Sequence, residues 1–230
     1  MSRRDGRSAH SSNARPAAGG GRIVDVPAVR LAGWVTRFAI RNSGITGMVA
    51  DTAGVTITAA DGTLVRIEVP FPPMSVGDRE PVEAVLDHCA GIGDIGMILV
   101  RAGAHSVGVC RDGTVTTSST DTHYVQGRTA AGGWSQQRFA RRRSNQLAAA
   151  QESTADAAAR LLSGRPLAAL VVGGELRSIS AVLGDPRLTR LITLPRREFR
   201  DIAEPRRVLL DEVARRSLEL TITVRDPLPT

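Results

Sequence analysis

Lysine is absent from the sequence, so all 30 basic residues are arginine. Aromatic residues make up only 3% of the 230 positions, and a hydrophobic core therefore has to come from Val, Leu, Ile and Ala. Two cysteines are too few for a disulfide framework. No apolar run approaches the roughly 18 to 20 residues that span a bilayer. These absences argue against a membrane-spanning or disulfide-stapled protein, and we expect a soluble, cytoplasmic one.

The charge balance points to a polyanionic partner. Thirty basic residues stand against 23 acidic ones, which gives a formal net charge of +7. Arginine binds phosphate through paired hydrogen bonds, so an excess made only of arginine favours a phosphate-bearing partner. Residues 1–22 are rich in Gly, Ser and Arg and poor in large apolar side chains. We expect a disordered basic arm there, with no secretion signal.

Residues 23–80 are predicted to form a small β-rich domain. Apolar and polar residues alternate over 34–41, 55–58 and 64–69, which is typical of half-buried strands. The Asp61-Gly62 pair lies between the last two runs and predicts a hairpin turn.

Residues 81–230 are predicted to form an α/β domain with a mixed sheet, so the chain is α+β overall. The continuous apolar run 167–172 is typical of a buried parallel strand. The pattern predicts helices over 80–89, 134–162, 176–183, 188–191 and 205–218. It predicts the other strands over 97–100, 106–110, 114–118, 122–127, 192–194 and 219–224.

Two patterns that could indicate cofactor sites are weak. Residues 91–96 spell G-x-G-x-x-G, but a helix is predicted before them and a strand after them, the reverse of a dinucleotide site. We expect a helix-to-strand turn and no nucleotide cofactor. The chain also has five possible metal ligands, but their spacing matches no known metal-binding arrangement. They are His88, Cys89, His105, Cys110 and His123.

The most informative stretch is 128–146, RTAAGGWSQQRFARRRSNQ. Residues 132–137, GGWSQQ, are predicted to be the functional loop; Gly132 and Gly133 make it permissive, and Ser135 is a predicted N-cap for the following helix. At about 100° per residue, three arginines of this helix fall within an arc of roughly 100°. They are Arg138, Arg141 and Arg142.

The opposite side of this helix is apolar and is predicted to dock on the domain. Arg143 lies near that stripe, so both a structural and an RNA-binding role remain open for it. The apolar positions are Phe139, Leu147, Ala150, Ala158 and Leu161.

This stretch resembles the catalytic loop of the eukaryotic and archaeal class I translation release factors. In that family a Gly-Gly-Gln loop precedes a helix of the form S-x-x-R-F-x-R-x-R. The same helix start is reproduced here by Ser135, Arg138, Phe139, Arg141 and Arg143. The resemblance extends over about 91–224 and is specific only in 127–143.

The chain departs from the family pattern at the glutamine. Trp134 occupies that position, and the glutamines come later, at Gln136 and Gln137. In this it resembles the bacterial, actinobacterial-type branch of the release-factor-like peptidyl-tRNA hydrolases. No separate codon-reading domain fits into 230 residues, so stop-codon reading is not expected.

The resemblance implies a hydrolase that frees nascent chains from stalled large ribosomal subunits. Its partners would be the rRNA of the peptidyl-transferase centre and peptidyl-tRNA, with no metal or other cofactor. Gln136, favoured over Gln137, would orient the attacking water, and backbone N–H groups would stabilise the oxyanion. The implied catalytic residues are Gly132, Gly133, Trp134, Ser135, Gln136 and Gln137, and the implied RNA-binding residues are Arg128, Arg138, Arg141, Arg142 and Arg143. Two alternatives remain: a tRNA 3′-end endonuclease and a non-catalytic ribosome- or RNA-binding module.

Overall fold

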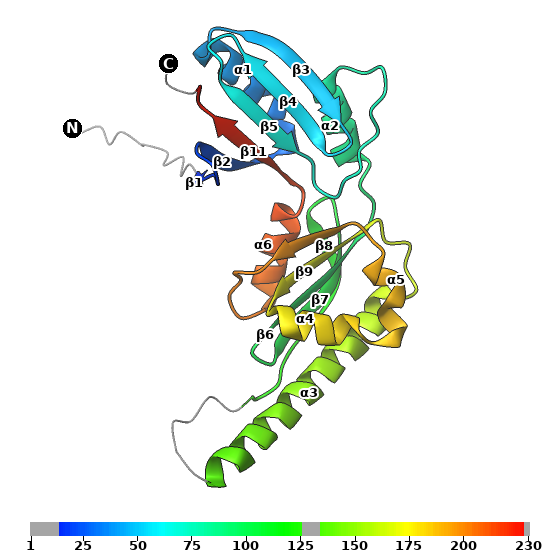
Figure 1. Ribbon diagram of the computed structural model, residues 1–230. Helices are drawn as coiled ribbons and strands as arrows, with labels where there is room; N and C mark the ends of the chain where they lie inside the picture. The colour runs from blue at the N-terminus through cyan, green and yellow to red at the C-terminus, as the bar shows by residue number, and fades with distance from the viewer. Residues whose placement is uncertain (1–13, 126–133, 228–230) are drawn as a thin grey trace, which may run out of the picture. The chain divides into compact units, whose positions relative to one another are not determined.

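The chain forms two compact units, each built around its own sheet. The computed structural model describes residues 14–125 and 134–227 (Figure 1). Unit 1 contains the chain up to Val69, Met74–Leu86 and the chain from Glu219 onward. Unit 2 contains Pro70–Pro73 and Asp87–Leu218. The architecture is therefore α+β, with one antiparallel and one mixed sheet.

Unit 1 contains an antiparallel sheet of six strands in the order β1-β2-β11-β5-β4-β3. The predicted hairpin forms between β4 and β5, where Gly62 has a φ of +86°. The strands are β1 (Arg15–Pro16), β2 (Arg22–Pro27), β3 (Ile45–Asp51), β4 (Gly54–Ala59), β5 (Leu64–Glu68) and β11 (Glu219–Arg225).

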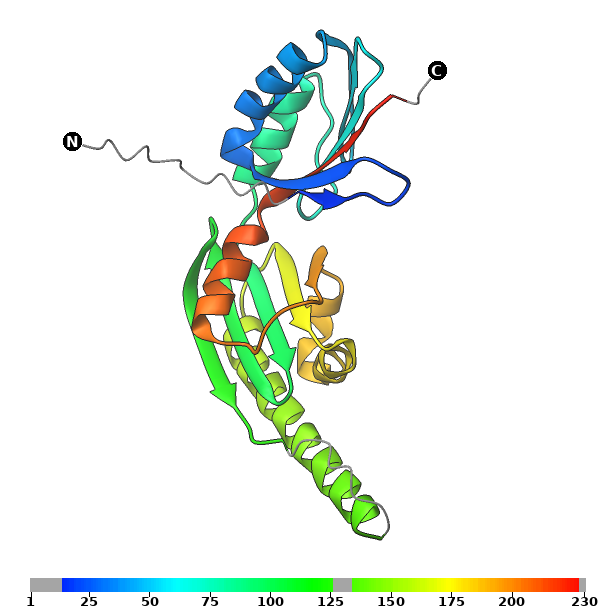
Figure 2. The same cartoon turned by 90° about the vertical axis from the view of Figure 1, so that its left-hand side faces the viewer.

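The helices of unit 1 lie on one face of this sheet (Figure 2). They are α1 (Leu31–Arg41), which follows the short helix η1 (Ala28–Arg30), and α2 (Pro81–Ala90). The prediction of a strand over 34–41 is wrong, because this segment is helical. Leu31 and Phe38 are its buried residues, seven positions apart, and Trp34 stacks on Phe38 with ring centroids 5.5 Å apart. That spacing places all three on one helical face, which outweighs the local alternation.

Part of the expected basic arm is ordered. Residues 15–22, which the sequence placed in that arm, form the β1–β2 hairpin instead. The Arg15 guanidinium is paired with the Asp25 carboxylate, and Ala17 donates its N–H to the Gly21 carbonyl, 3.1 Å away. Residues 1–13 lie outside the described residues.

Unit 2 contains a mixed sheet in the order β10-β9-β6-β7-β8. The three strands β10, β9 and β6 are parallel, and β6, β7 and β8 form an antiparallel meander. The strands are β6 (Ile95–Arg101), β7 (Ala104–Arg111), β8 (Thr114–Thr122), β9 (Ala169–Gly174) and β10 (Arg196–Phe199). The helices are α3 (Trp134–Leu162), α4 (Leu176–Leu183), η2 (Pro186–Leu188), α5 (Thr189–Ile192) and α6 (Arg207–Arg216).

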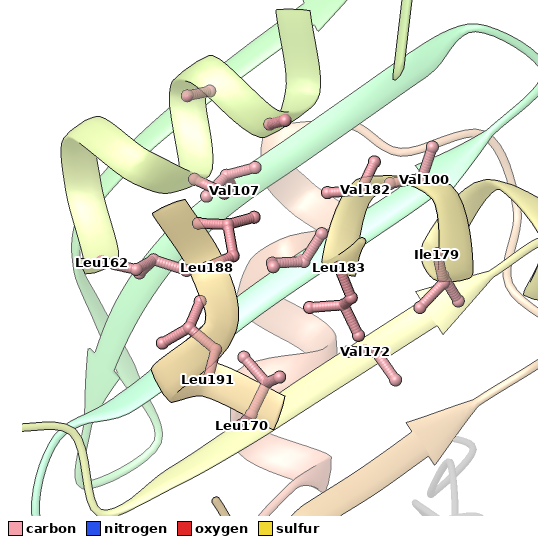
Figure 3. Packing of buried hydrophobic residues seen from close by; sticks show 14 of the residues in the cluster. Val100, Val107, Leu162, Leu170, Val172, Ile179, Val182, Leu183, Leu188 and Leu191 are labelled. Atoms are coloured by element: carbon pink, nitrogen blue, oxygen red, sulfur yellow. The ribbon is translucent and has the colours of Figure 1, made fainter. Parts of the chain in front are cut away.

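Both faces of the mixed sheet are buried. Along β6, Ile98 and Val100 face the α3–α5 side, whereas Met97 and Leu99 face the α6 side. This two-sided burial explains why the central strands are continuous apolar runs. Figure 3 shows the α3–α5 side, where the side chains come from strands and helices alike: Val100, Val107, Leu162, Leu170, Val172, Ile179, Val182, Leu183, Leu188 and Leu191.

Three predicted strands of this region differ from the structure. Of the strand predicted over 122–127, Thr122 is the last residue of β8, since its partner β7 begins at Ala104, which is paired with Thr122; 123–125 are not in a strand, and 126 and 127 lie outside the described residues. The strand over 192–194 instead lies at β10, after Pro195, because α5 continues through Ile192. The strand over 219–224 forms, but in the sheet of unit 1, where only one of its faces is buried.

Gly96 lies at a close contact in β6. A Cβ atom there would lie 2.9 Å from Leu167 Cδ1, in the core beneath α3. Because that atom is the far end of a partly buried side chain that can shift, we expect Gly96→Ala to lower the free energy of unfolding by only about 1 kcal/mol through overpacking. The matched control is Gly164→Ala, because a Cβ at Gly164 meets no atom within 4 Å. Urea denaturation of both variants measures the difference, and equal stabilities would contradict this packing argument.

Candidate functional site

Helix α3 has a buried half and an exposed half. Its 29 residues span about 44 Å at 1.5 Å per residue. Residues from Ala150 to Leu162 supply its buried side chains, whereas none of the described side chains from 137 to 149 is buried. In Figures 1 and 2 the N-terminal end of α3 extends past the edge of the mixed sheet. The predicted functional stretch therefore begins a projecting arm of unit 2.

Three arginines share one surface of this arm, as the sequence predicted. Arg138, Arg141 and Arg142 are exposed and line one open pocket of about 500 Å³. The pocket is completed by Asn145, Gln146 and Ala149. Sequence analysis missed Asn145 and Gln146 as lining residues. The same i, i+3, i+4 spacing, continued by one turn from the arginines, was the signal that could have identified them.

The three guanidinium groups are free to bind an external anion. None of them has an ion-pair or hydrogen-bond partner among the described residues of the chain. Two arginines on α6 behave differently, since Arg207 is paired with Asp211 and Arg216 with Glu212, one turn away. In the sequence, no Asp or Glu occurs between Arg128 and Gln151. The pocket is therefore a local concentration of positive charge with polar amide groups at its far end.

The predicted apolar stripe of α3 docks only along its second half. Ala150 and Ala158 are buried and Leu161 is partly buried, as expected, but 39% of Phe139 is exposed. Phe139 lies on the projecting part of the helix, beyond the sheet that covers the later stripe residues. Arg143 is half-buried, on the side of the helix away from the three-arginine pocket.

The glutamines lie in a helix and not in a loop. Because α3 begins at Trp134, residues 134–137 form its first turn. The prediction of Ser135 as the N-cap is wrong, since Ser135 is already the second helical residue. The first N–H groups of a helix have no acceptor within the helix, so the N–H groups of this turn are donors that α3 itself does not use. Gln137 is exposed. Arg128, Gly132 and Gly133 lie outside the described residues.

The other candidate sites have simpler explanations. The 91–96 motif joins α2 to β6, so a helix precedes it and a strand follows, as predicted. In the described ranges, no group of three His, Cys, Asp or Glu side chains is arranged to hold a metal ion. Burial raises the pKa of both Cys89 and Cys110 to about 11, so these thiols are protonated at neutral pH. None of the helices described is both long enough and apolar enough to cross a bilayer.

A histidine pair lies under α3, where β7 meets β8. His105 is buried, and its ring centroid lies 6.3 Å from that of His123. The Nδ1 atom of His105 is buried with no hydrogen-bond partner among the described residues. Burial lowers the pKa of His105, against the opposing effect of Asp121, and His123 and Arg160 lower it further.

This lowered pKa predicts that stability falls in mild acid. Below the ordinary histidine pKa of about 6.5, the unfolded chain takes up a proton that folded His105 resists. The free energy of unfolding should therefore be highest above that pH and decrease as the pH falls. In His105→Gln this decrease should be smaller between pH 7 and pH 5 in urea titrations. A pH dependence equal to that of the original protein would contradict the assignment.

Comparisons with known proteins identify the family. A crystal structure of the archaeal translation termination factor aRF1 aligns with a TM-score of 0.32 and 14% identity over 70% of this chain and 51% of that one. A structure described as an archaeal protein aligns with a TM-score of 0.27 and 13% identity, over 77% of this chain and 60% of that one. The chain thus spans about half the length of the termination factor. No curated protein sequence matches it. A family described as the Actinobacteria/chloroflexi VLRF1 release factor matches residues 93–223, more than half of the chain, and the chain therefore belongs to this release factor family.

Proposed function

We propose that this protein is a ribosome-associated peptidyl-tRNA hydrolase that releases nascent chains from stalled large ribosomal subunits. The observation that carries the proposal is the arrangement of α3. Its first turn follows directly on Gly132 and Gly133, and the next turns present three unpaired arginines around one open pocket. Membership of a release factor family supports the same role. The site of action would be the cytoplasm, and the partners would be rRNA and peptidyl-tRNA.

The arginine pocket would hold RNA. Phosphate oxygens accept paired hydrogen bonds from guanidinium groups, so Arg138, Arg141 and Arg142 suit the backbone of rRNA or of the tRNA acceptor end. Binding there would place the start of α3 at the ester that links the peptide to the tRNA. Arg128 and Arg143 are further RNA-binding residues of this proposal, and Arg143 would make a contact of its own, because it lies on the side of the helix away from the pocket.

The chemistry would come from positioning and from hydrogen-bond donors. The oxygen of water bonds to the ester carbonyl carbon and the C–O bond to the tRNA ribose oxygen breaks. The ribose oxygen leaves as a hydroxyl after taking up one proton of that water, the other proton passes to solvent, and the peptide is freed as a carboxylate. Backbone N–H groups of Trp134, Ser135 and Gln136, which lack acceptors within the helix, would stabilise the developing oxyanion. The Gln136 amide would orient the water, because an amide has no accessible pKa for general-base catalysis. The two glycines would let the backbone approach the ester closely.

The fate of the tRNA 3′ end tests this proposal. Purified protein is incubated with stalled ribosome–nascent-chain complexes, and the ends of the released tRNA are sequenced. Free peptide together with intact CCA ends is the expected result. Shortened ends would identify a tRNA endonuclease, and absence of release would leave an RNA-binding module; either result would overturn the proposal.

A further inference from the structure

A second arginine surface lies in unit 1, on α1. Arg30 immediately precedes the helix, and Arg37 and Arg41 lie on it at spacings of seven and four residues. At 100° per residue these three positions fall within an arc of roughly 40°, so they form one ridge along α1. The ridge extends over roughly 16 Å. All three side chains are exposed, and we call this surface the α1 ridge.

The α1 ridge carries charge that no carboxylate in the described part of unit 1 neutralises. None of its three guanidinium groups has an ion-pair partner in the described parts of the chain; the Arg41 Nε atom donates only to the Arg37 carbonyl, 3.3 Å away. The sequence has no Asp or Glu between Asp25 and Asp51. Both of those carboxylates are already paired, with Arg15 and Arg66, and the hydrogen bond from Arg66 is the largest cause that lowers the pKa of Asp51 to about 2.

The rest of α1 argues against a membrane partner. An amphipathic helix that binds a bilayer inserts its apolar face into the lipid. The apolar face of α1 is already occupied, since Leu31 and Phe38 are buried in the core of unit 1. Beside the ridge, 88% of Val29 and 77% of Ile40 are exposed, but these residues are eleven positions apart and form no continuous apolar patch. What remains for a partner is a row of guanidinium groups.

We propose that the α1 ridge is a second RNA contact, which binds the phosphate backbone of duplex RNA without reading its sequence. A row of unneutralised arginines along one helix face complements a row of negative charges on a phosphodiester strand. No base-reading side chain is required, because phosphate contacts position a protein without conferring specificity. The contact is independent of peptide hydrolysis, since it uses neither α3 nor the loop before it. It gives unit 1 a binding role of its own.

The test compares two triple variants of the full chain with equal charge loss. One replaces the ridge: Arg30→Gln, Arg37→Gln and Arg41→Gln. The control replaces three exposed arginines that lie apart and have no ion-pair partner among the described residues: Arg177→Gln, Arg190→Gln and Arg225→Gln. Binding of a fluorescent RNA hairpin is measured by anisotropy over a range of salt concentrations. A third variant, with lysine at the three ridge positions, keeps the charge.

The ridge variant should bind the hairpin roughly tenfold more weakly at about 0.1 M salt, with the slope of log K against log salt reduced by about 2 to 3. The control variant should lose much less affinity for the hairpin, and the lysine variant should retain most of it. Circular dichroism and the thermal midpoint establish that each variant is folded. Equal losses in the ridge and control variants would overturn the proposal, because net charge alone would then explain binding.

Two further results would also overturn it. One is unchanged hairpin binding by the ridge variant. The other is loss of binding to phosphatidylserine vesicles while hairpin binding persists, since the ridge would then serve a lipid surface. Peptide release measured on the same variants separates this proposal from the hydrolase proposal. If the original protein releases no peptide but the ridge variant still loses RNA affinity, only the hydrolase proposal is refuted.

Discussion

Gln136→Ala should slow peptide release from stalled large ribosomal subunits by roughly 10²-fold while ribosome binding persists. The reason is that the proposed mechanism draws its rate from positioning and preorganised donors, and losing one such group typically costs on the order of 10²-fold or more. The reporter is radiolabelled nascent peptide freed per unit time under single-turnover conditions. Co-sedimentation of the variant with large subunits shows that binding is intact.

Gln137→Ala is the matched control, since it removes the same amide from the adjacent position of the same helical turn. Successive positions of a helix are about 100° apart, so the two glutamines start from different sides of the first turn of α3. We expect this variant to release peptide at close to the original rate. If Gln137→Ala is the damaging change and Gln136→Ala is nearly silent, the roles of the two glutamines are reversed.

Gly133→Val tests the backbone part of the same mechanism. A branched side chain beside the first turn of α3 should block approach of the ester, with a loss again of roughly 10²-fold. If neither glutamine matters but this variant is inactive, the backbone N–H groups carry the chemistry without the side-chain amide. Full activity of Gly133→Val would contradict the proposed role of the glycine pair.

Replacing Arg138, Arg141 and Arg142 together by alanine should abolish co-sedimentation with large subunits at physiological salt. These side chains line one pocket and have no partner of their own among the described residues, so their charge is available to RNA. Removing about three phosphate contacts should also reduce the slope of log K against log salt by about 2 to 3. Sedimentation assays over a salt series measure both effects.

The control for this variant removes the same charge elsewhere, through alanine at Arg177, Arg190 and Arg225. These arginines are exposed and lie on three different elements, α4, α5 and β11, so they form no single row and their loss should weaken binding only slightly. Undiminished sedimentation of the pocket variant at physiological salt would refute a role for the three arginines in ribosome binding.

The long helix α3 was predictable to its end residues because its signals are local. A Gly-Gly pair precedes it, Gly164 and Pro166 follow it, and the apolar spacing is maintained through its buried half. The arginine face followed from the same periodicity. The exposure of Phe139 could not be predicted in this way, because no local pattern in the sequence shows where the sheet beneath a helix ends.

The prediction failed in unit 1 where two periodicities compete. The segment around Trp34 alternates like a strand, yet Leu31 and Phe38 share a helical face, and packing against the sheet decides between them. The placement of β11 was beyond local reasoning as well. Its partners β2 and β5 are more than 150 residues earlier in the chain, and nothing in 219–224 specifies which sheet the strand completes.

The source of the oxygen in the released peptide tests the central claim most directly. Stalled complexes are treated with the protein in water enriched in oxygen-18, and the freed peptide is analysed by mass spectrometry. Hydrolysis of the ester predicts one oxygen-18 atom in the C-terminal carboxylate of a peptide that carries no nucleotide. A released peptide without the heavy isotope, still joined to tRNA nucleotides, would contradict the account.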